Sequence, residues 1–402
     1  MSFQQGLSGL NAAAKNLDVI GNNVANSNTA GFKQGVTAFA DVFAASLGGG
    51  GGTQVGIGTQ VTSVGQQFSQ GNITVSSNPL DVAINGKGFF RVSDNGVISY
   101  TRNGQFQVDK NGYIVGVSGQ NLTGFQAVNG AIVPGVLVNL QLSSADVLPK
   151  PSANAAIGAN LASTDPILPT AGFVSTSPAS YNFSTASTAY DSLGQSHTMN
   201  FYFNKTAANT WDANVYIDGA AANGAGVSTL TFNSSGTFVS ATNMVKTAVF
   251  VNGAAPLSMT IDFSKMTQFG SGFGVNSLSQ DGYASGQLSG YNISSDGIIL
   301  GRYSNGQAQN LGQVALSNFT NPQGLTPLGD SMWSESSDSG IPLTGSPNTA
   351  SLGTLQSSAI EDSNVDLTGE LVDMITAQRV YQANAQTIKT QDALMQTLVN
   401  LK

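Results

Sequence analysis

Residues 3–24, FQQGLSGLNAAAKNLDVIGNNV, place apolar or small residues at alternating steps of four and three. This spacing is typical of a helix that presents one narrow seam to a partner helix, as in a coiled coil. The positions between are mostly Ser, Asn, Gln and Ala. The pattern therefore predicts an N-terminal helix within residues 1–28. Its large apolar seam residues are Leu7, Leu10, Leu17 and Val24.

A second segment with the same rhythm lies at the other end of the sequence. It keeps the alternating steps from residue 367 to 388 and continues less regularly, because Asp392 falls on the seam. Ser363 or Asp366 can cap its start, where acidic residues also favour the positive end of the helix dipole. We predict a helix within residues 363–402 that pairs with the first. Its seam residues are Leu367, Leu371, Met374, Tyr381, Ile388 and Leu398.

Between these ends the sequence changes to short alternating runs interrupted by Gly and Asn. Asn-Gly pairs at residues 95–96, 103–104 and 111–112 favour tight hairpins, because both residue types tolerate positive φ. Two stretches rich in small residues, 148–169 and 270–279, are interpreted as joints between domains. Strand patterns occur at residues 198–204, 211–217, 229–232 and 257–263.

We therefore predict a multidomain fold, an α-helical coiled-coil terminal pair plus two nested mainly-β domains. Nesting keeps the two chain ends adjacent, as a helical pair requires. The outer β domain is inserted into the middle one, and linking segments join the middle domain to the helices. The predicted ranges are 1–28 and 363–402 for the helices, 29–70 and 350–362 for the linking segments, 71–147 and 282–349 for the middle domain, and 148–281 for the outer domain.

Composition excludes several classes of function. Charged residues make up 9% of the 402-residue chain, against about 25% in ordinary domains. A net charge of −8 gives no attraction to nucleic acid or to anionic lipid. No apolar run approaches the ~20 residues that span a bilayer, so we expect no membrane insertion. The first residues lack the pattern of a cleaved signal peptide.

The sequence nominates no catalytic, cofactor or metal-binding residues. It has no cysteine, and its one histidine, His197, lies in a strand-like run where we expect a surface residue. Residues 109–112 lack the Glu of an EF-hand loop, and the glycines of 270–274 do not form a nucleotide-binding turn. A carboxylate pair for glycoside hydrolysis is not excluded by sequence alone.

Three groups of motifs stand out along the chain. The N-terminal group is LDVIGNNVAN at 17–26 with TAGFK at 29–33. The internal group is LDVAI at 80–84, GFF at 88–90 and YTRNGQF at 100–106. The C-terminal group is NVDL at 364–367, ELVDM at 370–374, QRVY at 378–381 and NA at 384–385. Together they resemble the signatures of one family, the bacterial flagellar rod and hook axial proteins, and the resemblance covers both ends of the chain and most of residues 71–125.

Length and the strand-rich insertion make the hook branch of this family the best match. The resemblance implies a subunit that polymerises into the flagellar hook, a curved extracellular tube that surrounds the export channel. This tube acts as a universal joint and transmits torque from rod to filament. The implied partners are further copies of the chain, the distal rod protein, the hook-filament junction protein, the hook cap and the flagellar type III export apparatus. Distal rod and hook-filament junction proteins are the alternatives within the family.

One further motif concerns export. Residues 39–43, FADVF, resemble the export-gate motif of early flagellar subunits, with Phe39 and Phe43 as its apolar positions. The alternative is an apolar turn that docks on the neighbouring domain.

Two interpretations from other classes remain open. The helices could be ordinary amphipathic caps on a β domain. Alternatively, the chain could be a secreted β-rich adhesin or a carbohydrate-acting protein, which would leave the two matched helical ends unexplained. Electron microscopy of the purified protein separates these classes, because tubular polymers favour the hook and stable monomers that bind glycan favour the adhesin.

Overall fold

A computed structural model describes residues 2–42, 56–128, 130–143, 145–224 and 226–400. Phe43 and the run Gly48–Gly52 therefore lie outside the described residues. The chain forms two compact units. Unit 1 comprises Met1–Ser143, Gly290–Gly301 and Ala308–Lys402, and unit 2 comprises Ser144–Ser289 and Arg302–Gln307.

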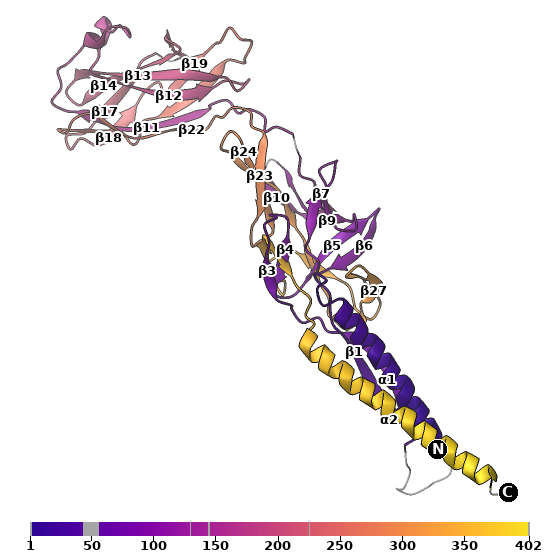
Figure 1. Ribbon diagram of the computed structural model, residues 1–402. Coiled ribbons are helices and arrows are strands. Elements are labelled where there is room, and N and C mark those ends of the chain that lie inside the picture. Colours follow the sequence, from indigo (N-terminus) through magenta and orange to yellow (C-terminus); the bar gives the residue numbers. More distant parts are fainter. Residues whose placement is uncertain (1, 43–55, 129, 144, 225, 401–402) are drawn as a thin grey trace. The chain divides into compact units, whose positions relative to one another are not determined.

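The two terminal segments of unit 1 are helices that run side by side in opposite directions (Figure 1). Helix α1 spans Ser2–Ala25 and helix α2 spans Leu367–Asn400. The backbone N–H of Thr368 donates to Asp366 Oδ1 at 3.0 Å, so Asp366 caps α2 as predicted. The last turns of α2 extend past the start of α1.

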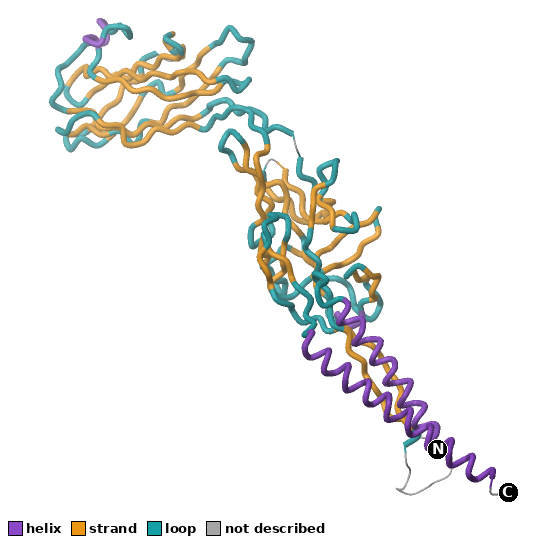
Figure 2. The backbone as a smooth tube through the Cα atoms, viewed as in Figure 1, coloured by secondary structure: helices purple, strands orange, loops and turns teal. Residues whose placement is uncertain are grey.

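A long antiparallel hairpin lies along the helical pair (Figure 2). Strand β1 (Gly35–Val42) pairs with β2 (Gly58–Gln66). Side-chain hydrogen bonds fasten the hairpin to α1, because Gln5 Nε2 donates to the carbonyl of Gly56 at 2.6 Å and Ser8 Oγ accepts from the N–H of Thr59 at 3.3 Å.

The rest of unit 1 is a β body. Two short pairs, β3–β31 and β4–β30, bring the segment after the hairpin against the segment before α2. The main sheet buries a core around Phe90, Leu122 and Leu316, and a second cluster surrounds Trp333. The short pairs are β3 (Ile73–Val75), β31 (Ala359–Glu361), β4 (Val82–Asn85) and β30 (Thr354–Ser357). The main sheet contains β5 (Phe89–Asp94), β6 (Val97–Thr101), β7 (Phe106–Val108), β8 (Ile114–Gly116), β9 (Asn121–Val128), β10 (Ala131–Asn139), β23 (Leu288–Ile293), β24 (Ile298–Tyr303), β25 (Ala308–Val314), β26 (Leu316–Asn318), β27 (Thr326–Gly329), β28 (Met332–Ser334) and β29 (Leu343–Gly345).

Two of the predicted Asn-Gly turns close hairpins, and one does not. Asn95-Gly96 joins β5 to β6 with φ of 48° and 94°, and residues 111–112 join β7 to β8. The prediction for Asn103-Gly104 was wrong, since β6 pairs with β5 and β28 whereas β7 pairs with β8. The carbonyl of Gly104 instead accepts from the N–H of Val82 at 2.9 Å, so this segment crosses to another strand.

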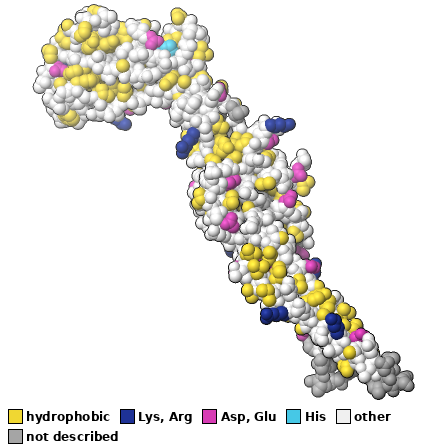
Figure 3. Space-filling view, in the orientation of Figure 1, with side chains coloured by type: hydrophobic (Ala, Val, Ile, Leu, Met, Phe, Trp, Pro, Cys, Tyr) yellow, Lys and Arg dark blue, Asp and Glu magenta, His cyan; other side chains and the backbone are white. Residues whose placement is uncertain are grey.

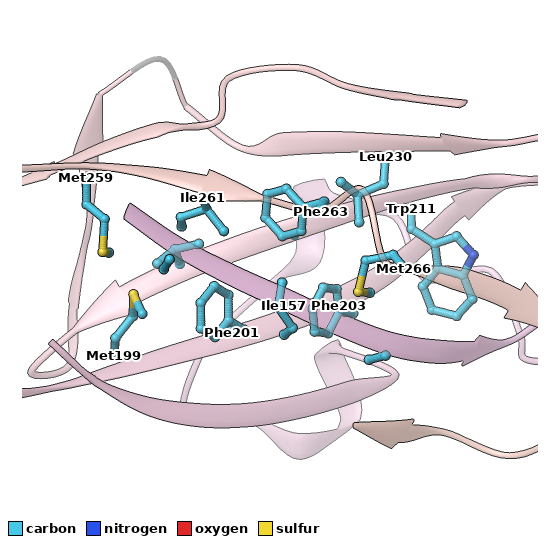
Figure 4. Close-up of a cluster of buried hydrophobic side chains, with 14 of the residues drawn as sticks. Ile157, Met199, Phe201, Phe203, Trp211, Leu230, Met259, Ile261, Phe263 and Met266 are labelled. Carbon is cyan, nitrogen blue, oxygen red and sulfur yellow. The ribbon is translucent and has the colours of Figure 1, made fainter. Parts of the chain in front are cut away.

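Unit 2 consists of two sheets packed around one apolar core (Figure 4). Large side chains such as Phe201 and Phe203 from one sheet meet Met259 and Ile261 from the other. One sheet contains β11 (Asn154–Ala162), β16 (Asn223–Gly224), β19 (Val245–Ala248), β20 (Leu257–Asp262), β21 (Thr267–Phe269) and β22 (Gly274–Gln280). The other contains β12 (Phe183–Tyr190), β13 (Ser196–Ala207), β14 (Thr210–Ile217), β15 (Ala220–Ala221), β17 (Ser228–Phe232) and β18 (Phe238–Ala241).

The strand patterns predicted for this region coincide with β13, β14, β17 and β20. Both predicted joints were wrong. The first contains β11, which pairs with β20, β21 and β22, and the second contains most of β22. Their small residues belong to strands whose backbones are paired, so composition alone did not distinguish them from linkers.

Candidate assembly surface

The face of α1 that packs inside the chain is made mostly of small and polar residues, with Ile20 as a large apolar member. Gly6, Ala13 and Ile20 are buried and lie seven residues apart, and Asn23 extends the same face. A Cβ atom at Gly6 would lie 3.1 Å from Ile388 Cγ1, so glycine here lets the two helices approach closely. This row lies one residue before the predicted apolar seam.

Helix α2 carries a row of residues with the same seven-residue spacing, which faces the row of α1. Glu370 and Ala377 are buried, and Asn384 follows after another seven residues. The amide of Asn384 lies close enough to Gly9 that a Cβ there would be 2.8 Å from Asn384 Oδ1. Contacts within a single chain therefore use a row of small and polar residues, which leaves the larger apolar residues of both helices near the surface.

A polar cluster at one end fixes how the helices meet. Asn23 Nδ2 donates to Glu370 Oε1 at 2.9 Å, and Gln34 Nε2 donates to the same oxygen at 2.6 Å. Asn23 also donates to the carbonyl of Gly35 and accepts from its N–H, both at 2.8 Å. Glu370 is 4% exposed, so these donors are needed to stabilise a buried carboxylate. This cluster was not predicted, although the seven-residue spacing of Glu370, Ala377 and Asn384 is readable from the sequence.

None of the predicted seam residues whose side chains are described is buried. Leu7, Leu367, Leu371 and Tyr381 are exposed, and the remaining five are half-buried. The side chain of Leu398 lies outside the described residues. Among the predicted residues, Ile388 contributes to the helix pair, since its Cγ1 lies against Gly6, and the role of these residues in contacts between copies stays a prediction. The half-buried residues are Leu10, Leu17, Val24, Met374 and Ile388.

Helix α2 carries exposed apolar side chains along its length. Figure 3 shows hydrophobic side chains at the surface of the helical end of unit 1. The exposed fractions of these side chains lie between 37% and 62%. These exposed apolar side chains make α2 a candidate for contacts with other molecules. We call this the α2 apolar surface, and it consists of Leu367, Leu371, Val372, Ile375, Val380, Tyr381, Leu394 and Met395.

A groove of about 750 Å³ lies between α1, the β1–β2 hairpin and α2. Its walls include Ala12, Phe39 and Val380, with Glu370 and Asp373 at one side. Phe39 is 47% exposed and pairs with Val61 across the hairpin, so it lies in a strand rather than in a turn. Phe43, the other position of the export motif, lies outside the described residues.

His197 lies in unit 2, far in sequence from this surface. We expected a surface strand residue, and His197 does lie in a strand, as the second residue of β13, but it is only 9% exposed. Its ring stacks on Phe250 at a centroid distance of 3.7 Å and lies between the carboxylates of Asp191 and Asp218. Burial alone raises the pKa of Asp191, but hydrogen bonds from Asn252, the Gln195 N–H and His197 outweigh it and lower that pKa. These contacts hold loops of unit 2 together.

The residues that the structure describes contain no group of three or more His, Asp or Glu side chains arranged to hold a metal ion. None of their helices is long and apolar enough to cross a membrane.

Four family models match successive parts of the chain. The flagella basal body rod protein model matches residues 3–33, and the flagellar hook protein FlgE/F/G D1 domain matches residues 83–150. The flagellar basal body protein FlaE D2 domain matches residues 160–283, which lie within unit 2. The flagellar basal body rod FlgEFG protein C-terminal model matches residues 356–401.

Whole-chain relatives agree with these matches. The chain is 43% identical to the flagellar hook protein FlgE of Escherichia coli (strain K12), and the alignment covers all of both chains. It is 36% identical to the flagellar hook protein FlgE of Rhizobium meliloti (strain 1021), over all of this chain and 98% of that one. The crystal structure of the Helicobacter pylori flagellar hook protein FlgE2 matches 70% of this chain and 99% of its own, with a TM-score of 0.53. At 15% identity, that last match supports the fold alone.

Proposed function

Because the chain belongs to the family of bacterial flagellar hook proteins, we propose that it is the structural subunit of the hook, without catalytic activity. Copies of the chain polymerise into an extracellular tube that joins rod to filament. The observation that carries this proposal is full-length identity of 43% to a hook protein, together with the α2 apolar surface left uncovered in one chain. Association of copies would remove this surface from water.

In this proposal the terminal helices line the export channel, and the β regions lie outside them. The helices pair through small residues, as at Gly6 and Ala13, so each pair keeps apolar residues free for neighbouring copies. The low content of charged residues allows many copies to pack without strong like-charge repulsion. The nested domain ranges given above remain part of this proposal, in which the β domains slide against their neighbours as the tube bends and transmits torque.

The proposed partners at the two ends of the tube are the distal rod protein and the hook-filament junction protein, with a hook cap during growth. The proposed route out of the cell is the flagellar type III export apparatus, which recognises the segment at Phe39 and Phe43. Partial exposure of Phe39 on the hairpin is compatible with that recognition.

A test of assembly uses two residues of the α2 apolar surface. Leu371 and Ile375 are 45% and 52% exposed and lie four residues apart on one helix face. We expect Leu371→Gln with Ile375→Gln to abolish tube formation, because glutamine retains helix propensity but gains little from burial. Electron microscopy and sedimentation of the concentrated protein measure polymer formation, and circular dichroism confirms that the monomer is folded.

The matched control is Thr376→Gln, a polar change at an exposed position of the same helix. It should leave both the polymer and the monomer unchanged. Normal tubes from the double variant would contradict the proposed role of this surface. A wild-type chain that stays monomeric and binds glycan would instead favour the adhesin interpretation.

A further inference from the structure

Three motifs that lie far apart in the sequence meet at one buried carboxylate. Lys33 ends the motif that follows α1, Arg102 belongs to the TRNG motif of the β body, and Glu361 lies just before α2. The three side chains are 0–5% exposed. Lys33 Nζ lies 2.6 Å from Glu361 Oε1, and Arg102 NH1 lies 3.0 Å from Glu361 Oε2. We call these three residues the Glu361 cluster.

Backbone groups complete the cluster and join further segments to it. The N–H of Gly71 donates to Glu361 Oε1 at 2.9 Å, and the N–H of Gly31 donates to the Glu361 carbonyl at 2.8 Å. Lys33 also donates to the carbonyl of Ser69 at 2.8 Å, and Arg102 donates to the carbonyl of Gly86 at 2.8 Å. The segments after α1, before α2 and at the edge of the β body therefore share one buried acceptor.

The charges in the cluster do not balance. Two cations share one carboxylate, while Arg102 Nε is buried without a hydrogen-bond partner. Burial lowers the pKa of Lys33 despite the opposing carboxylate of Glu361, and the positive charge of Arg102 lowers it further. Loss of the carboxylate would leave two buried like charges side by side, whereas loss of one cation would leave a compensated pair. Breaking a buried ion pair from one side is strongly destabilising for this reason.

We propose that Glu361 is a positioning residue that couples the terminal helical pair to the β body by compensating Lys33 and Arg102 at once. This carboxylate adds to the β3–β31 and β4–β30 pairs a direct link between the bases of both helices and the body. The coupling acts within a single chain and does not require assembly. The proposal for Glu361 therefore does not depend on the proposal that the chain forms the hook.

The test measures amide hydrogen exchange by mass spectrometry on the full-length chain in dilute solution. In Glu361→Gln, we expect exchange in segments 29–35, 69–76 and 359–366 to rise by about 100-fold or more. Strand β5 in the core of the body should keep its protection. The matched control is Asp18→Asn, which removes the same charge from an exposed pair in which Lys15 Nζ lies 3.9 Å from Asp18, and it should change nothing.

A second variant separates charge compensation from ordinary packing. Lys33→Met combined with Glu361→Gln removes one of the two uncompensated cations. We therefore expect slower exchange in the three segments than in Glu361→Gln alone, and recovery of folding if the single variant fails to fold. Faster exchange in the double variant would overturn the proposal. So would a change of less than about three-fold in Glu361→Gln, or an equal loss of protection in β5.

Discussion

Asp281 directly follows strand β22 of unit 2, and its carboxylate accepts several hydrogen bonds. Its Oδ1 accepts from the backbone N–H groups of Ala153 and Asn154, both at 2.8 Å, and its Oδ2 lies 3.2 Å from Lys150 Nζ. Burial alone raises the pKa of Asp281, but these hydrogen bonds outweigh it and lower the pKa to about 2. The ionised carboxylate therefore ties the start of β11 to the end of β22.

This shift predicts how the stability of unit 2 depends on pH. The folded-state pKa lies below the ordinary value of 3.8, so the stabilisation is present above about pH 4 and is lost as the pH falls towards 2. Because the side chain is 29% exposed, solvent screens part of the effect, and we expect about 1–2 kcal/mol. Asp281→Asn should lose this amount at pH 7 and little at pH 2. Denaturant unfolding of both proteins across this range checks it, and equal pH dependence would contradict it.

At the scale of elements, the sequence predicted long periodic features better than irregular ones. Both helices and the strands with large side chains were predicted, because burial of one face imposes a period. Strand β11 was missed because Ala, Asn and Gly make up most of it, although Ile157 and Leu161 alternate with Ala155 and Ala159 among its buried residues. The residues with which it pairs in β20, β21 and β22 lie more than 100 residues away in sequence, and no local pattern reveals that pairing.

The candidate surface shows the same limit. The heptad spacing of the helices was readable, but the row that packs inside the chain was not the most apolar one. Gly6 and Ala13 permit close approach, and Asn23 with Glu370 satisfies the polar groups that this contact buries. The pattern of large apolar residues at heptad spacing therefore pointed to the row next to the one that packs inside the chain. The proposed contacts of that row with other copies remain a prediction.

The β1–β2 hairpin carries the prediction on export. Phe39→Ala with Phe43→Ala should reduce secretion to background while the soluble protein keeps its melting temperature, because the partly exposed Phe39 contributes little to the fold. Secretion into the medium is measured against the intracellular amount. Val36→Ala is the matched control, as Val36 lies on the same strand with 42% exposure. Undiminished secretion of the double variant would refute the export interpretation and favour a docking role for this segment.

At the scale of the whole molecule, the two units have separate apolar cores. Among the described residues, the buried members of the unit 2 core all lie between Ala155 and Met266, and the clusters of unit 1 contain none of them. Each unit also holds one of the two tryptophans, Trp211 in unit 2 and Trp333 in unit 1. Cores without shared residues give each unit its own unfolding free energy.

We therefore expect two unfolding transitions with different midpoints. In Trp333→Phe the fluorescence of Trp211 reports unit 2, and in Trp211→Phe the fluorescence of Trp333 reports unit 1. Guanidinium titration of both variants measures the two midpoints, and circular dichroism of the wild type should show both steps. Coincident curves from all three measurements would show instead that the chain unfolds as one cooperative unit.

The short pair β3–β31 has a consequence for the order of events in time. The hydroxyl of Thr74 donates to Asp362 across a separation of 288 residues, and most of the chain lies between these two partners. When the chain emerges with its N-terminus first, all of unit 2 emerges before strand β31. Strand β3 then stays unpaired while some 280 further residues emerge, because its partner strand lies near the end of the chain. The β body is completed only when the C-terminal segment has emerged. The subunit therefore reaches its folded form only after the whole chain has emerged.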